Sequence, residues 1–225
     1  MTIQALSSLR DQFKKSLAND VGALVRLYER ENEGRGRPGD WLRPLKRSAV
    51  VLIASNLENF VEELVCGALA HLHSLNVVAR RYPEGFRIWR FRSSAHMRNL
   101  REDNTKDLIE LSFKLYSDVR PLSADELKLD EIRDTFANPI AKNVNWIMSL
   151  LDVPDYCSSK SVTVDGVEIG LVSGLGELAK RRNDVAHGNA NVQPSIDDVK
   201  RLSKFAQLLA TRMMRDVESA ILRCI

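Results

Sequence analysis

The stretch DWLRPLKRSAVVLIASNLENFVEELVCGALAHL, residues 40–72, decides the fold. Its apolar side chains return every three or four residues, which is the repeat of one face of an α-helix. The apolar positions are Leu42, Leu45, Ala49, Leu52, Ile53, Leu57, Phe60, Val61, Leu64, Ala68 and Leu72. The sequence therefore predicts a long helix that begins near Asp40, a favourable N-cap, and forms the centre of a helical bundle.

The segments around this stretch also have a helical period. Residues 1–32 predict one N-terminal helix, and the glycine-rich residues 33–39 predict a loop after it. Residues 107–119 predict a further helix. Later helices are predicted to start at three capping patterns, namely Ser123 with Glu126, Asn138 with Pro139, and Ser195 with Asp198.

Residues 161–169 contain the one predicted β element. Apolar and polar residues alternate on both sides of Asp165-Gly166, a pair that favours a two-residue hairpin turn. The sequence thus predicts an all-α fold, a single bundle domain over residues 1–225, with this small hairpin before a helix that ends at Gly188. Residues 80–101 break the helical pattern and are expected to form an insertion.

Bulk composition excludes several classes of protein. The 225 residues, 44% of them hydrophobic, suit one substantial core. No apolar run approaches the roughly 20 residues that cross a bilayer, and Met1 to Lys15 lack the apolar segment of a signal peptide. Cys66, Cys157 and Cys224 share no close spacing and indicate neither a disulfide framework nor a zinc site. We therefore expect a cytoplasmic protein without a membrane segment. The net charge of +3 does not by itself indicate nucleic acid.

The segment RRNDVAHGN, residues 181–189, carries the chemistry. It places a guanidinium (Arg182), an amide (Asn183) and an imidazole (His187) on the last turns of the predicted helix. Asn183 and His187 lie one helical turn apart, and the long side chain of Arg182 can reach the same side. These groups are what cleavage of a phosphodiester needs when no metal takes part.

Cleavage of RNA by its own 2′-hydroxyl needs a base, stabilisation of charge at the phosphorane, and an acid for the leaving 5′-oxygen. The planar fork of Arg182 suits phosphate, His187 suits the acid, and Asn183 can orient either His187 or a phosphate oxygen. One chain offers one such histidine, so the sequence predicts a homodimer whose two copies share a site, with no cofactor and no metal. The alternative is that His187 caps the helix end and Arg182 makes a surface ion pair.

The run Arg-Asn-x-x-x-His followed by Gly resembles the signature of the HEPN superfamily of all-α ribonucleases. The stretch ASNLENFVEEL, residues 54–64, and the Asn-Pro pair ahead of the motif resemble its RiboL-PSP-HEPN-type branch. The resemblance implies a metal-independent endoribonuclease, usually dimeric and often a toxin or part of antiviral defence. It also implies that Arg182 and His187 are the catalytic pair, with Asn183 as polar support.

Two further positions bear on this resemblance. Glu58 matches an acidic position that the family often places near the motif, and the alternative is a solvated charge on a helix. HEPN toxins paired with nucleotidyltransferase antitoxins commonly carry a tyrosine two residues after the histidine, where this chain has Asn189. This departure argues against control by nucleotidyl transfer and leaves the prediction of cleavage unchanged.

Residues 80–101 are the second feature that indicates RNA. They contain seven arginines and one glutamate, with four aromatic residues interleaved. Arginine neutralises phosphates and aromatic rings stack on unpaired bases, which suits single-stranded RNA. Two alternatives stay open: the aromatic side chains pack on the bundle while the arginines extend to solvent, or the segment binds an acidic partner such as an antitoxin. The predicted RNA contacts are Arg80, Arg81, Arg87, Trp89, Arg90 and Arg92.

The sequence favours a metal-free HEPN-type endoribonuclease that acts on RNA as a homodimer. One alternative is a catalytically inactive HEPN module that binds RNA or a partner protein. Another is a neutralising partner in a defence system, which would bind a protein through residues 80–101.

Overall fold

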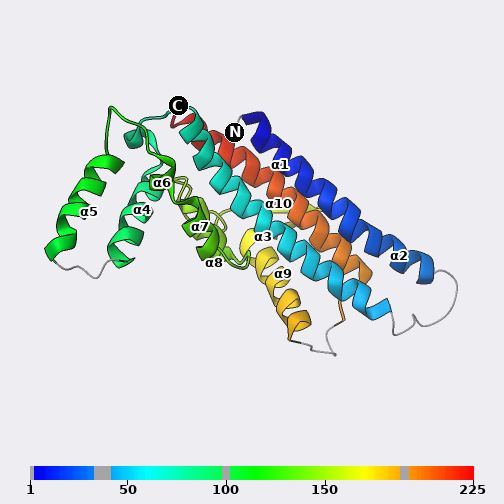
Figure 1. Cartoon of the computed structure of the whole chain (residues 1–225). Coiled ribbons are helices and arrows are strands. Elements are labelled where there is room, and N and C mark those ends of the chain that lie inside the picture. The colour runs from blue at the N-terminus through cyan, green and yellow to red at the C-terminus, as the bar shows by residue number, and fades with distance from the viewer. Residues whose placement is uncertain (1–2, 33–41, 98–101, 188–192) are drawn as a thin grey trace.

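The computed structural model describes residues 3–32, 42–97, 102–187 and 193–225 (Figure 1). These residues form a bundle of α-helices with one antiparallel hairpin, which confirms the predicted fold class. The predicted helix boundaries at Asp40 and Gly188 lie outside the described residues. In chain order the elements are α1 (Ile3–Ser16), α2 (Gly22–Asn32), α3 (Arg43–Ser74), α4 (Glu84–Met97), α5 (Glu102–Leu115), α6 (Ala124–Leu127), α7 (Leu129–Thr135), α8 (Ala141–Ser149), β1 (Ser161–Val164), β2 (Val167–Gly170), α9 (Leu171–Ala186) and α10 (Ile196–Leu222).

Helix α3 is the centre of the bundle, as its apolar period predicts. It lies beside α10, and α1 and α2 run back along both helices (Figure 1). Leu57 and Leu64 of α3 and Leu209 and Met213 of α10 are fully buried. Burial of each such side chain contributes about 1.5–3 kcal/mol, so the period of the sequence determines which face of each helix turns inward. No helix in the described ranges combines the length and apolarity needed to span a bilayer.

The predicted N-terminal helix contains one π-helical turn. This turn, Leu17–Val21, joins α1 to α2. Phe13, Leu17 and Val21 are all buried, and the ring of Phe13 packs on Phe60 with 4.9 Å between centroids. Their spacing of four exceeds the 3.6 residues of an α-helical turn, so a wider turn keeps all three side chains on the face that contacts α3.

The described part of the predicted insertion, residues 80–97, is largely helical, and the predicted break in the helical pattern there is wrong. A short 3-10 turn (Ala79–Arg81, labelled η3) leads into α4. Tyr82 and Phe86 are buried and Trp89 is half-buried, so these aromatic residues lie on one face of a helical path. The arginines between them lower the local hydropathy, which concealed the period in the sequence.

The predicted helix start at Asn138 is also wrong, because α8 begins at Ala141 with Ile140 as its N-cap. Asn138 instead adopts a left-handed backbone conformation with φ of 58°, which asparagine tolerates better than most residues. Its backbone N–H donates to Glu58 Oε1 of α3 at 3.1 Å. A contact across the bundle therefore sets this bend, and a local capping pattern does not.

The two predicted capping boxes are confirmed. The backbone N–H of Asp198 donates to Ser195 Oγ at 2.9 Å, and the backbone N–H of Ser195 donates back to the Asp198 carboxylate at 2.9 Å. Ser123 and Glu126 form the same arrangement at the start of α6. Lys128, in a left-handed conformation, then separates α6 from α7.

The hairpin β1–β2 has the predicted turn. Asp165 and Gly166 have φ of 50° and 82°, the two positive values that a turn of this type requires. Val162 and Val164 are buried, and β1 contacts α10. The hairpin is thus fixed to the bundle immediately before α9 begins.

Helix α9 follows the hairpin directly and positions the candidate site. Leu171, Leu175 and Leu178 are buried, and α9 contacts α3, α8 and α10. A Cβ on Gly174 would be 2.3 Å from the ring of Phe205, so this glycine lets α9 pack directly against α10. The first half of α9 is fixed in the core, and its C-terminal end extends away from the central helices with the motif (Figure 1).

Candidate active site

The predicted motif lies at the exposed end of α9. The helix ends at Ala186, and His187 is its C-cap, where its backbone N–H donates to Asn183 O at 2.9 Å. Asn183 and His187 are exposed and Arg182 is half-buried. The three motif residues therefore occupy the last turns of the helix at the surface, as the sequence predicts; Asn189 lies outside the described residues.

The two adjacent arginines of the motif have different environments. Arg181 Nε donates to Glu177 Oε1 at 3.0 Å, and Arg181 Nη2 donates to Asp198 Oδ1 at 3.0 Å. Arg201 of α10 forms ion pairs with the same two carboxylates. We call Glu177, Arg181, Asp198 and Arg201 the α9–α10 clamp, because these ion pairs join α9 to α10 directly beside the motif.

Both carboxylates of the clamp have lowered pKa values. Burial acts to raise the pKa of Glu177, but hydrogen bonds from Arg201 and Arg181 outweigh it and bring that pKa below the usual 4.5. Burial likewise acts to raise the pKa of Asp198, and the hydrogen bonds from Ser195 together with the two guanidinium charges outweigh it. Both groups are therefore ionised at neutral pH, where the clamp is intact.

Arg182 and His187, unlike Arg181, form no ion pair with the described residues that would join α9 to another helix. Arg182 Nη1 donates a long hydrogen bond, 3.4 Å, to Asn183 Oδ1, which brings the two side chains together. In the described part of the chain no carboxylate pairs with Arg182, and the His187 imidazole has no hydrogen-bond partner. A cation and an imidazole on adjacent turns are thus available to a bound phosphate.

Arg47 is a residue of this site that the sequence analysis missed. Its Nη2 donates to the backbone oxygen of Val185 at 3.1 Å. The last carbonyl groups of a helix have no partner within the helix, so this bond holds the last turn of α9 from outside. Val185 lies between Asn183 and His187, and Arg47 therefore acts on the turn that carries the motif. The two residues are 138 positions apart, and no pattern in the sequence connects them.

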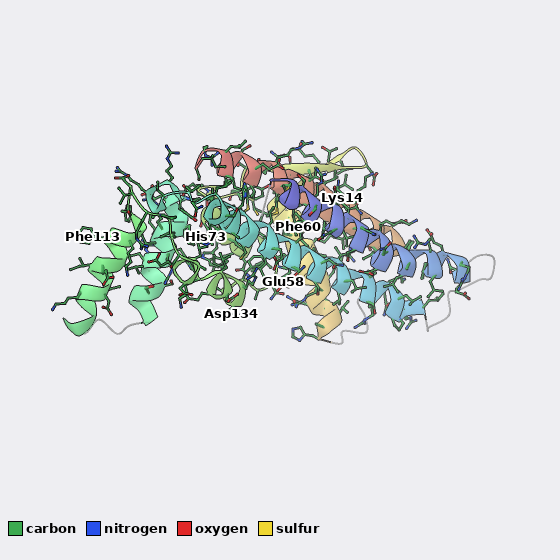
Figure 2. All side chains as sticks on the ribbon, turned by 45° about the horizontal axis from the view of Figure 1, so that its top comes forward. Lys14, Glu58, Phe60, His73, Phe113 and Asp134 are labelled. Atoms are coloured by element: carbon green, nitrogen blue, oxygen red, sulfur yellow. The ribbon has the colours of Figure 1, made fainter. Side chains whose placement is uncertain are left out.

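Glu58 of α3 contacts the backbone of a segment that is distant in the sequence. Its carboxylate accepts the backbone N–H of Asn138, and Figure 2 labels it on α3. It lies in an acidic neighbourhood, where burial first and neighbouring carboxylates next, Glu58 included, raise the pKa of Glu62. No hydrogen bond or ion pair among the described residues joins Glu58 to the motif, and negative charge here repels phosphate. We therefore leave Glu58 out of the proposed catalytic set.

Three of the arginines predicted to contact RNA bind other parts of the chain. These contacts agree with the alternative in which the segment packs on the bundle. They leave less of each guanidinium for phosphate. The bonds run from Arg80 Nη1 to Asp118 Oδ2 at 2.8 Å, from Arg81 Nη1 to Ile225 O at 2.7 Å, and from Arg87 Nε to Tyr82 O at 3.0 Å.

Arg90 is enclosed within the fold, with a relative exposure of 7%. Its Nε donates to Glu126 O at 2.8 Å, and its Nη1 contacts Ser94 Oγ. We therefore leave Arg90 out of the proposed RNA contacts. Arg92, by contrast, is exposed and forms no ion pair with any described residue, and Trp89 is half-buried beside it.

The described residues contain no group of three or more His, Cys, Asp or Glu side chains arranged to hold a metal ion. The three cysteines are buried free thiols. Burial raises the pKa of Cys66 to about 12, which keeps this thiol protonated and unreactive at neutral pH.

A comparison with known protein families gives a match over most of the chain. The family model described as RiboL-PSP-HEPN matches residues 7–219. The chain belongs to the RiboL-PSP-HEPN family. This match confirms the resemblance drawn from the motif, and it indicates a nuclease or another RNA-related role for this HEPN protein. No match was found among curated proteins or among solved structures.

Proposed function

We propose that this HEPN protein is a metal-independent endoribonuclease that uses the 2′-hydroxyl of its RNA substrate as the nucleophile. One observation carries the proposal: at the end of α9 the fold uses Arg181 and leaves Arg182 and His187 at the surface without a carboxylate or imidazole partner among the described residues. The presence of Arg181 is explained by its contribution to the stability of the fold, because it pairs with Glu177 and Asp198. A cation beside an imidazole, in a family with an RNA-related role, is better explained by a phosphate substrate.

In the proposed step, the 2′-oxygen forms a bond to phosphorus as the bond between phosphorus and the 5′-oxygen breaks. A base takes the proton of the 2′-hydroxyl, and an acid gives a proton to the leaving 5′-oxygen. The products are a 2′,3′-cyclic phosphate and a 5′-hydroxyl. Arg182 stabilises the negative charge on the phosphorane, His187 transfers a proton, and Asn183 orients Arg182 through the bond described above.

We further propose that two chains share the catalytic site. The motif of one chain supplies one imidazole, whereas the step needs a base and an acid at the same phosphate. A second copy related by a two-fold axis would bring its own Arg182 and His187 to that phosphate. From the family we infer a toxin or an antiviral-defence effector that acts in the cytoplasm.

The test is to incubate purified protein with structured and unstructured RNA in EDTA and to analyse the 3′ ends of the products. Arg182→Ala and His187→Ala are compared with the wild type. Arg215→Ala, at an exposed position of α10, is the matched control. Cyclic-phosphate ends that both motif substitutions abolish and the control retains would support the proposal. Intact RNA with a folded, dimeric wild type would contradict it and favour a HEPN module that binds RNA or a partner without cleavage.

A further inference from the structure

An open cleft of about 790 Å³ lies between α4 and α8, apart from the motif. This volume is in the range of sites that bind nucleotide-sized molecules, roughly 300–1,000 Å³. Each helix contributes one face, because the lining residues recur at helical spacing. The lining includes Gly85, Trp89 and Arg92 of α4 with Trp146 and Ser149 of α8, and two acidic residues, Glu84 and Asp152, line it where the first turn of α4 meets the end of α8.

One end of the cleft is closed by direct contact between the two elements. A Cβ on Gly85 would be 1.9 Å from the backbone oxygen of Ser149, so only glycine allows this approach. Asp152 fixes the contact, because its Oδ2 and Oδ1 accept the backbone N–H groups of Glu84 and Gly85 at 2.8 and 2.6 Å. The first turn of α4 is thus fixed against the end of α8, and the cleft opens along α4 toward Arg92.

The open part of the cleft combines aromatic surface with a cation. Trp89 and Trp146 both line it, and both are half-buried, so part of each ring faces the cleft. Phe86 lies behind Trp89 with 6.0 Å between ring centroids and supports it. Arg92 is exposed, and no described carboxylate pairs with it. A flat ring joined to an anion complements this arrangement.

The orientation of the cleft relates it to the motif. Figures 1 and 2 both show the C-terminal ends of α4 and α9 on the same side of the molecule. The lining of the cleft runs along α4 from Gly85 to Arg92, toward this C-terminal end, and Arg182 and His187 lie in the last turns and at the C-cap of α9. An RNA strand that occupied both places would run along this side of the molecule.

We propose that the cleft binds an unpaired nucleobase of single-stranded RNA, with the base against Trp89 and Trp146 and a phosphate at Arg92. The proposal rests on the proposed function, since the occupant belongs to the RNA that the α9 motif cleaves. Every base offers a flat face, so stacking of this kind tolerates many sequences. A base inside a duplex has both faces covered, so the cleft selects single strands. An acidic peptide would use Arg92 but would leave the two indole rings without a matching partner.

The test measures binding without catalysis. A fluorescent 2′-O-methyl RNA hexamer, which lacks the nucleophilic hydroxyl, is titrated against the wild type as a single strand and as a duplex. Arg92→Glu and Trp146→Leu are each expected to weaken single-strand binding on the order of tenfold or more, with a much smaller change for the duplex. Arg215→Glu makes the same change of charge at an exposed site of α10 and should have little effect.

Two readouts separate binding from folding. Trp146 also packs on the core, so Arg92, which is exposed, provides the variant that leaves packing intact. Arg92→Ala should reduce the slope of log affinity against log salt by about 0.7, the value for one phosphate contact on a single strand. Photo-cross-linking with a 5-iodouridine hexamer, followed by peptide mass spectrometry, should label Trp89 or Trp146.

The outcomes distinguish this proposal from the proposed function. If the protein binds and cross-links RNA at the cleft but leaves RNA intact, the proposal of a base-binding cleft stands and the proposal of a ribonuclease is rejected. If the wild type cleaves RNA and both cleft variants bind the hexamer as tightly as the wild type, the proposal of a base-binding cleft is rejected and the proposal of a ribonuclease stands. Failure to bind the hexamer, or cross-links only elsewhere, would overturn the cleft. Preference for an acidic peptide over the hexamer would also overturn it and assign the cleft to a protein partner.

Discussion

The end of α9 and helix α4 are similar in sequence and different in structure. Both carry closely spaced arginines that suggest phosphate binding. In α9 the fold uses Arg181 and leaves Arg182 at the surface. In α4 the fold uses Arg87 and Arg90 and leaves Arg92. The partners of each guanidinium, and not the number of arginines, therefore separate structural residues from candidates for function.

The difference has an energetic basis. A buried cation such as Arg90 is tolerated only when its donors are satisfied, and the partly buried Arg181 is paired with two carboxylates, so both arginines contribute to the stability of the fold. An exposed arginine without such contacts can be removed with little change in stability, within about 0.5 kcal/mol. Substitutions at neighbouring positions should therefore separate loss of stability from loss of function.

The largest expected effect comes from the pair Arg181 and Arg182. Arg182→Ala should lower the cleavage rate about 100-fold or more, because it removes charge stabilisation at the phosphorane, and should leave Tm unchanged. Arg181→Ala should do the reverse: it breaks the α9–α10 clamp, so Tm falls while most of the cleavage remains. Single-turnover rates and thermal unfolding on the same preparations test this. Equal losses of rate in the two variants would remove the distinction between the two arginines.

The second effect concerns Arg90 and Arg92 of α4. Arg90→Ala removes the donor to the Glu126 carbonyl oxygen inside the fold, and should lower the free energy of unfolding by about 1–3 kcal/mol. Arg92→Ala should change it by less than about 0.5 kcal/mol. Urea titrations of both variants against the wild type provide the measurement. If Arg92→Ala destabilised the protein as much as Arg90→Ala, then Arg92 would be part of the fold and not of a binding surface.

Local patterns in the sequence predicted the elements that carry the site. Three confirmed predictions depend on neighbouring residues only. They are the apolar face of α3, the hairpin turn at Asp165-Gly166 and the capping box at Ser195. The position of the motif at the end of α9 followed from the same local period. Burial of one apolar helix face and hydrogen bonding of the N–H groups at a helix start are both properties of a short segment. The sequence of that segment was therefore sufficient to predict them.

Contacts between distant segments were not predictable in this way. Glu58 sets the bend at Asn138 from 80 residues away, and Arg47 reaches Val185 across 138 residues. Helix α4 was missed for a related reason, since Arg90 is buried although arginine is almost always exposed. In each case a polar side chain forms a hydrogen bond with a backbone group elsewhere in the chain, and no local pattern in the sequence indicates that pairing.

Arg47 also acts at the motif end of α9, where we propose that it positions the last turn of the helix and does not contact the substrate. Arg47→Ala should lower the cleavage rate about tenfold, since displacement of a catalytic group by around 1 Å has effects of this size or larger. Hydrogen exchange should become faster at the backbone amides of the last turn of α9, near Val185 and His187. Arg47→Lys, which keeps the charge and loses the planar fork, is the matched variant. Loss of activity without faster exchange would contradict a positioning role and indicate direct contact with phosphate.

The smallest expected effect is the pH dependence of the clamp. The pKa values of Glu177 and Asp198 are lowered in the folded protein, so their contribution is fully present above the unfolded values of about 4.5 and 3.8 and is lost as pH falls through the folded values. These groups are a quarter to a third exposed, so solvent screening limits each pair to less than about 1 kcal/mol.

Urea unfolding of the wild type and Glu177→Gln between pH 7 and pH 3 measures that contribution. We expect the wild type to be more stable at pH 7 and the difference to shrink below pH 4.5, as Glu177 takes up a proton and becomes as neutral as the glutamine that replaces it. A difference that stays constant over the whole range would mean that Glu177 holds α9 by packing and not by charge. Arg181 would then be neutralised by Asp198 alone, and the contrast between the two arginines would be weaker.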